Sequence, residues 1–245
     1  MRALQASMLS VALLAGCSES VEGRALRTAR TGTEQALPTS SELSQALGMP
    51  MQQDAAVRVG GGDILKSSAN ALPQMCVGVA HSGDRQTYKD AHLSAAAQGS
   101  WITSGDGDQT RVLITVVEFS SPADAHVWYS NATSDWQRCQ GVTVTARTES
   151  FTFADSDNRV EESDGLLSAE LLLSTKEGLL TPTPHSRAVT AALRYGVDVE
   201  VLGRVEGGDF SAKSGGGVVH DGSVDRPEWI DLRRFISRHD LVSSS

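Results

Sequence analysis

An apolar run that ends abruptly at a cysteine constrains this chain more than any other feature of its sequence. Residues 9–20 read LSVALLAGCSES, and the apolar stretch from about Met8 to Gly16 follows an arginine near the amino end. The run is too short to cross a bilayer, which needs about 20 apolar residues, but it has the length of the apolar core of a secretory signal peptide. We therefore expect residues 1–16 to be a signal peptide that takes no part in the folded domain.

The end of this run, Leu14-Ala15-Gly16-Cys17, has the form of a bacterial lipobox. The small residues let the backbone enter a peptidase as an extended chain, and the thiol of Cys17 is the nucleophile that can carry a diacylglyceryl group. The alternative is an ordinary secretory signal followed by a chance cysteine. We expect Cys17 to be lipidated and to anchor the chain on the extracytoplasmic face of the cell membrane, with the polar residues 17–36 as a flexible tether.

Length and charge limit the number of domains and the kinds of partner. The chain has 245 residues, 40% of them hydrophobic, which suits one sizeable domain, or at most two small ones, with a core that forms without a metal. Its net charge of −9 repels phosphate backbones and anionic headgroups. We therefore expect no nucleic-acid partner, and we expect the membrane to be reached through the lipid and not through a basic patch.

Cysteine usage predicts one disulfide. The chain has three cysteines, and lipidation of Cys17 leaves Cys76 and Cys139 as a pair in an oxidising compartment. The alternatives are two buried free thiols or a zinc site, and the wide spacing disfavours zinc because a local metal knuckle needs closely spaced ligands. We expect a Cys76–Cys139 bridge.

Two helices can be placed from local signals. Thr39-Ser40-Ser41-Glu42 reads as a capping box for a short helix, Ser40 to Leu47, which Gly48 closes. Ser121-Pro122 opens a longer helix that ends near Cys139. On it Trp128, Tyr129 and Trp136 recur at helical spacing, which favours the core over a stacking surface. A disulfide at the end of this helix would pin it to the segment that carries Cys76.

The remaining segments read mainly as strands. Residues 111–119, RVLITVVEF, are rich in β-branched residues and predict a central strand that forms a hairpin with Gln98 to Thr103. Further strand-like segments are Cys76–Ala80, Val142–Ala154, Leu166–Ser174 and Ser186–Val205. A glycine-rich loop, Gly207 to Asp225, and a closing helix, Pro227 to Arg238, complete the expected order.

No catalytic or metal centre emerges from the sequence. The six histidines, His81, His92, His126, His185, His220 and His239, are scattered, and we expect each on the surface or in a loop. Asp155-Ser156-Asp157-Asn158 lacks the glycine and glutamate of a calcium loop, and Ser82 lies outside a nucleophile elbow. We expect no cofactor and no metal.

Several motifs follow one another along the chain: the lipobox, the tether, SELSQALG, CVGV, Tyr88, VVEF, the helix that ends in DWQRC and a final short helix. In this order they resemble the extracellular sensor domain of the mycobacterial serine/threonine kinase PknH. The resemblance covers residues 37–239 and implies an α+β fold, in which a twisted antiparallel sheet packs with helices in a sandwich-like arrangement and leaves a cleft. It implies sensors or binders, not enzymes. The kinase domain has a second disulfide, which this chain lacks because no cysteine follows Cys139.

These observations favour a lipid-anchored sensor-type domain that binds a small cell-envelope molecule. Tyr88 is the strongest candidate for ligand contact, because its ring can line a cleft while its hydroxyl bonds the ligand. An interaction or scaffold protein that docks another envelope protein is the alternative. An enzyme, such as a hydrolase, is the third reading, and only a deep pocket with a titratable group of shifted pKa would favour it.

Overall fold

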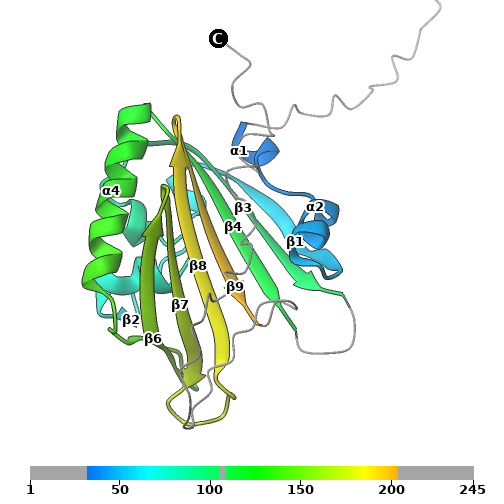
Figure 1. Ribbon diagram of the computed structural model, residues 1–245, viewed down its shortest axis with the longest axis vertical. Coiled ribbons are helices and arrows are strands. Elements are labelled where there is room, and N and C mark those ends of the chain that lie inside the picture. Colours follow the sequence, from blue (N-terminus) through cyan, green and yellow to red (C-terminus); the bar gives the residue numbers. More distant parts are fainter. Residues whose placement is uncertain (1–31, 105–108, 204–245) are drawn as a thin grey trace, which may run out of the picture.

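The computed structural model describes residues 32–104 and 109–203 (Figure 1). The signal peptide, Cys17, most of the expected tether, the glycine-rich loop and the closing helix lie outside the described residues. Within them, none of the helices combines the length and apolarity needed to cross a lipid bilayer.

One antiparallel sheet of nine strands forms the centre of the described chain, in the order β1-β3-β4-β9-β8-β7-β6-β5-β2. The α+β class and the antiparallel sheet are thereby confirmed. The strands are β1 (Met51–Gly60), β2 (Ala71–Leu72), β3 (Leu93–Thr103), β4 (Arg111–Phe119), β5 (Val144–Arg147), β6 (Thr152–Ser163), β7 (Leu166–Thr175), β8 (Thr183–Ala192) and β9 (Tyr195–Leu202).

Helices cover both faces of this sheet, and each face has its own hydrophobic core. The helix α4 (Pro122–Arg138) packs on one face through Trp128 and Trp136. On the other face, α1 (Gly32–Gln35) and α2 (Ser40–Leu47) pack against alternate residues of β4 and β9. Figure 1 shows α4 and the two amino-terminal helices on opposite sides of the sheet.

The amino-terminal helices form partly as the sequence predicts. Thr39 and Glu42 make the reciprocal capping box, and Gly48 ends α2 in a left-handed conformation, φ 67°. The last residues of the predicted tether, residues 17–36, belong to the folded domain instead. Residues 32–35 form α1, and the following Ala36 and Leu37 are buried in the core with α2, so that the folded domain begins no later than Gly32.

The predicted hairpin and long helix are confirmed. β3 and β4 pair with Gln98 opposite Thr115, and α4 starts at Pro122 behind the capping residue Ser121. Trp128 and Trp136 are buried, as their helical spacing indicates. The predicted segment Val142–Ala154 divides into β5 and the start of β6, which a turn at 148–151 connects.

The prediction of a strand at Cys76–Ala80 is wrong. Gln74–Cys76 is a 3-10 turn (η2), and Val77–Ala80 is a single turn of α-helix (α3). The segment crosses the sheet face instead of extending it, and a helical turn buries Cys76, Val77, Val79 and Ala80 together. A short apolar run reads the same in either structure, so periodicity alone could not decide.

The long connection between β1 and β3, residues 61–92, lies over the face of the sheet that α4 also covers. We call residues 61–92 the cap segment. It contains η1 (Gly62–Ile64), β2, η2, α3 and η3 (Arg85–Tyr88). Asp84 ties it together, because its carboxylate accepts from the backbone nitrogens of Ser68 at 2.6 Å and Gln86 at 2.8 Å.

Candidate functional site

Charged side chains on β8 and β9 lie buried beneath the cap segment. In β9 the valines 197, 199 and 201 enter the core beneath α1 and α2, so the alternating Asp198 and Glu200 face the cap segment instead. In β8 the same alternation places His185 and Arg187 on the cap side. Register places Arg187 opposite Glu200 and His185 opposite Leu202. The two strands thus present four ionisable groups to one buried surface.

Asp198 is the centre of this cluster. Its carboxylate accepts from the guanidinium of Arg187 at 2.7 Å, and on the cap side from the Gly83 backbone nitrogen and the Tyr88 hydroxyl, each at 2.9 Å. Gly83 has a φ of 61°, and a β-carbon there would overlap the side chains of Thr115 and Gln98. Glycine therefore permits both the turn and the close approach of the cap segment to the sheet.

Arg187 joins the sheet to the cap segment and to α4. Besides Asp198, its guanidinium donates to the carbonyl oxygens of Val199 at 2.7 Å and Gly78 at 2.9 Å, and its central carbon lies 5.4 Å from the ring centre of Trp136. The side chain is fully buried, which requires such compensation of its charge.

A second group of contacts surrounds Glu200. Its carboxylate accepts from the Ser82 backbone nitrogen at 2.7 Å and lies 3.8 Å from Nε2 of His185. Nδ1 of His185 is 2.5 Å from the carboxylate of Asp155 in β6. Burial acts to raise the pKa of Glu200, but His185, Arg187, His81 and the Ser82 amide outweigh it, and the pKa is lowered.

The expectation that His185 lies on the surface is wrong. It is among the most deeply buried side chains of the described chain, because it pairs with Asp155, a residue of the rejected calcium-loop pattern. His81 and His92 lie in connecting segments and His126 is exposed on α4, while His220 and His239 are outside the described residues. Burial lowers the pKa of His81, with Glu200 and Asp155 opposing the shift and His185 and Arg187 reinforcing it.

Tyr88 lies in the same cluster, at the end of η3. Its side chain is 3% exposed, its ring stacks on Trp128 with centroids 5.4 Å apart, and its hydroxyl already donates to Asp198. Burial and the Asp198 charge raise the pKa of Tyr88 well above its usual value. The ligand role of Tyr88 stays a prediction, and in this arrangement a ligand reaches the hydroxyl only if the cap segment shifts.

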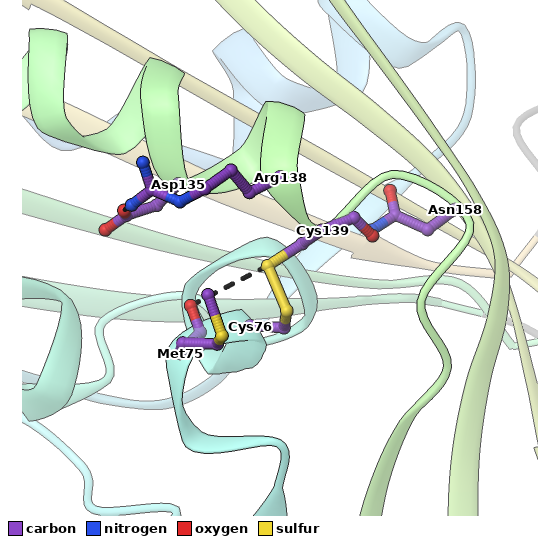
Figure 2. The surroundings of a disulfide bond; sticks show 6 residues. All are labelled: Met75, Cys76, Asp135, Arg138, Cys139 and Asn158. Atoms are coloured by element: carbon purple, nitrogen blue, oxygen red, sulfur yellow. Dashed lines mark hydrogen bonds and ion pairs between the residues drawn. A yellow bond between two sulfur atoms is a disulfide. The ribbon is translucent and has the colours of Figure 1, made fainter.

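The predicted pair Cys76 and Cys139 is bonded in the structure, with Cα atoms 5.6 Å apart (Figure 2). The bond fastens the cap segment to the end of α4. Asn158 of β6 donates its side-chain amide to the Cys139 carbonyl at 2.9 Å, so three elements meet at this point. Figure 2 also shows the Asp135–Arg138 ion pair on the last turn of α4.

The buried cluster contains ionisable groups that are paired with one another, but in the described residues its hydroxyl and imidazole groups are not placed as a nucleophile and a base. The Ser82 hydroxyl bonds the Asp198 carbonyl at 3.0 Å and lies 3.4 Å from Thr115 Oγ1. In residues 32–104 and 109–203, no three side chains of His, Cys, Asp or Glu are grouped to hold a metal ion.

Sequence reasoning missed the charged residues of this cluster: Asp155, His185, Arg187, Asp198 and Glu200. A signal for two of them was present. In YGVDVEVL, Asp198 and Glu200 alternate with the valines 197, 199 and 201. Such a strand is buried on one face, so the acids on the other face need either solvent or buried partners. Only the position of the cap segment over the sheet shows that these acids have buried partners.

Comparison with known proteins agrees with this architecture. The family model described as PknH-like extracellular domain matches residues 28–219. The structure is similar to the extracellular domain of PknH from Mycobacterium tuberculosis, with 23% identity and a TM-score of 0.56, covering 69% of this chain and 83% of that chain. A putative uncharacterized protein from Mycobacterium smegmatis gives 14% identity and a TM-score of 0.34, with coverage of 82% and 92%. No curated protein matches.

Proposed function

The chain belongs to the family of PknH-like extracellular domains, and on this basis we propose that it is a lipid-anchored, non-catalytic sensor-type domain. It works on the extracytoplasmic face of the cell membrane and binds a small cell-envelope molecule in a cleft. The family match over residues 28–219 is the observation that carries this proposal.

The anchor is the lipid on Cys17. The first described residue, Gly32, lies fifteen positions further along the chain (32 − 17 = 15), and a fully extended chain of that length spans about 50 Å. The domain therefore stays within that distance of the bilayer surface. Mass spectrometry of the amino-terminal peptide from native membranes tests the anchor, and Cys17→Ser should move the protein into the soluble fraction. An unlipidated wild-type peptide would contradict it.

The ligand site lies beneath the cap segment, with Tyr88 as the first residue to test. Support comes from the polar character of this interface, where the contacts of Ser82, Gly83 and Tyr88 end on Glu200 and Asp198. A ligand with its own hydrogen-bond donors can replace such contacts without leaving a buried carboxylate unpaired.

A thermal-shift screen of the purified chain against peptidoglycan fragments and glycolipid headgroups tests binding. A ligand should raise the melting temperature, since it binds only the folded state. Tyr88→Phe should reduce this shift, while Tyr129→Phe, at a half-buried position of α4 where the hydroxyl donates to Glu162 of β6, should leave it unchanged. Equal shifts in both variants would remove Tyr88 from the site.

A docking role for another envelope protein is the second candidate. Leu179 and Leu180 are exposed in the turn after β7, and Phe151 is exposed in the turn before β6. The two turns meet at one end of the sheet, where Thr152 bonds Glu177 and Lys176. Exposed apolar side chains that gather in one place, unlike single ones, are typical of protein-contact sites. Leu179→Ser with Leu180→Ser should abolish crosslinking to a partner, whereas Leu193→Ser, exposed in another turn, should not.

A further inference from the structure

We propose that the cap segment is held on the sheet by an acid-sensitive latch, in which protonation of His81 loosens residues 81–88 from the charged face of β8 and β9. The inference concerns the conformation of the cap segment and does not depend on which molecule the domain binds.

The latch consists of polar contacts that depend on charge. Three donors of the cap segment, the Ser82 and Gly83 amides and the Tyr88 hydroxyl, end on Glu200 or Asp198, at 2.7 to 2.9 Å. In the other direction Arg187 donates to the Gly78 carbonyl at 2.9 Å. The cap-segment residues among them, Gly78, Ser82, Gly83 and Tyr88, lie within seven positions of His81 in the chain. A change of charge at position 81 therefore acts directly on the contacts that hold the segment down.

His81 is placed where a positive charge is poorly accommodated. Its Nε2 is buried and has no hydrogen-bond partner among the described residues. Of the charged groups around it, Glu200 on β9 and Asp155 on β6 attract an imidazolium, while Arg187 on β8 repels it, as does a protonated His185 on the same strand. Burial is nevertheless the largest influence, and the net effect lowers the pKa of His81.

His185 completes the charge pattern without taking the same role. Its Nδ1 is engaged by Asp155 at 2.5 Å, and its Nε2 lies 3.8 Å from Glu200, so a proton on this ring meets two carboxylates. Asp198 lies beyond Arg187 and is paired with it. Nε2 of His185, like Nε2 of His81, has no hydrogen-bond partner among the described residues, but it lies within ion-pair distance of Glu200, whereas Nε2 of His81 faces no carboxylate at that distance among them.

The direction of the pH effect follows from this difference. When the segment lifts, His81 becomes hydrated and its pKa returns toward about 6.5, the value of an unperturbed histidine. The open form then binds more protons than the closed form below that pH, so acidification favours opening. Each unit of pKa difference between the two forms allows about a tenfold rise in the ratio of open to closed molecules. Glu200, whose pKa is lowered, stays ionised through this range.

Hydrogen exchange of the purified chain tests the latch. Exchange is measured at about pH 7.5 and about pH 5.5, the range over which histidine titrates, and corrected for intrinsic rates. Amides of residues 81–88 should lose protection on acidification, whereas those of β4 should not. His81→Gln should abolish the change, and the matched control His126→Gln, at an exposed position of α4, should retain it. An unchanged pH response in His81→Gln overturns the proposal, as does its absence in the wild type.

A second measurement holds even if His81→Gln fails to fold. In wild-type NMR titrations the His81 ring should titrate below the value of an unperturbed histidine, about 6.5, and the Ser82 and Gly83 amide signals should change with the same midpoint as His81. Glu200→Gln should move that midpoint to lower pH, because it removes a negative charge that favours the imidazolium. Amide changes that follow the His185 ring instead, or no amide change, would refute the latch.

Discussion

The carboxylate of Asp198 lies 2.7 Å from the guanidinium of Arg187, and both side chains are completely buried between the strands β8 and β9 and the cap segment. This ion pair sits across two neighbouring strands and receives the cap segment through Gly83 and Tyr88. It lies in the interior of a domain whose two apolar cores are on opposite faces of the sheet.

Asp198→Asn should destabilise the protein severely, by about 3–5 kcal/mol, because it leaves the Arg187 charge buried without its partner. Urea denaturation at neutral pH measures the loss. Asp54→Asn provides the control, since Asp54 pairs with Arg111 at 3.5 Å on the surface, where such pairs contribute about 0–1 kcal/mol.

Replacement of both partners, as Arg187→Met with Asp198→Leu, should recover part of the loss, because no unpaired charge remains. The contrary result is a double variant whose free energy of unfolding is lower than that of Asp198→Asn by the full effect of a second, independent substitution. That result would show that the other contacts of Arg187 contribute more to stability than its charge pairing.

Gly83→Ala should displace the cap segment. Gly83 and Gly48 both have positive φ, but only at Gly83 would a β-carbon overlap a neighbour, the Thr115 hydroxyl. Gly48→Ala should therefore cost about 1–2 kcal/mol for the left-handed backbone alone, and Gly83→Ala clearly more. Comparison of their denaturation midpoints, with hydrogen exchange of residues 81–88, measures the difference. Equal losses would mean that the cap segment accommodates the added methyl group.

Removal of the disulfide should lower the free energy of unfolding by roughly 4 kcal/mol, the value of the chain-entropy treatment for a closed loop of this size. The bond joins residues 63 positions apart. Denaturation of Cys76→Ser with Cys139→Ser, compared with wild type before and after reduction, tests this. The reduced wild type should match the double variant. If reduction has no effect on the wild type, the bond does not form in solution.

Stability should fall at alkaline pH through Tyr88. Its pKa is raised in the folded state by burial and by Asp198, so above about pH 10 the unfolded chain loses the phenol proton first. The contribution is present below that pH and is lost as the pH rises toward the folded pKa. Tyr88→Phe should flatten the decline in denaturation measured from neutral to alkaline pH, while Tyr129→Phe should keep it. A decline of the same slope in Tyr88→Phe would assign it to other groups.

Local signals predicted the elements whose partners lie nearby in the chain. The capping box of α2, the proline start of α4 and the β3–β4 hairpin depend on residues a few positions apart, and the structure confirms each. The segment Cys76–Ala80 failed because its four apolar residues satisfy a helical turn or a strand equally well. Its contacts come from distant parts of the chain: Arg187, for example, donates to the Gly78 carbonyl from 109 positions away.

The sequence alone predicted the pairing of Cys76 with Cys139 from the number of cysteines, and it predicted the family and the α+β class from a resemblance in the order of its motifs. Only the tertiary structure determined which polar and charged side chains are paired in the interior. Tyr88 meets Asp198 across 110 positions, and His185 meets Asp155 across 30. Such pairings stabilise the fold only after the cap segment has excluded water from the sheet face, so no local pattern can specify them.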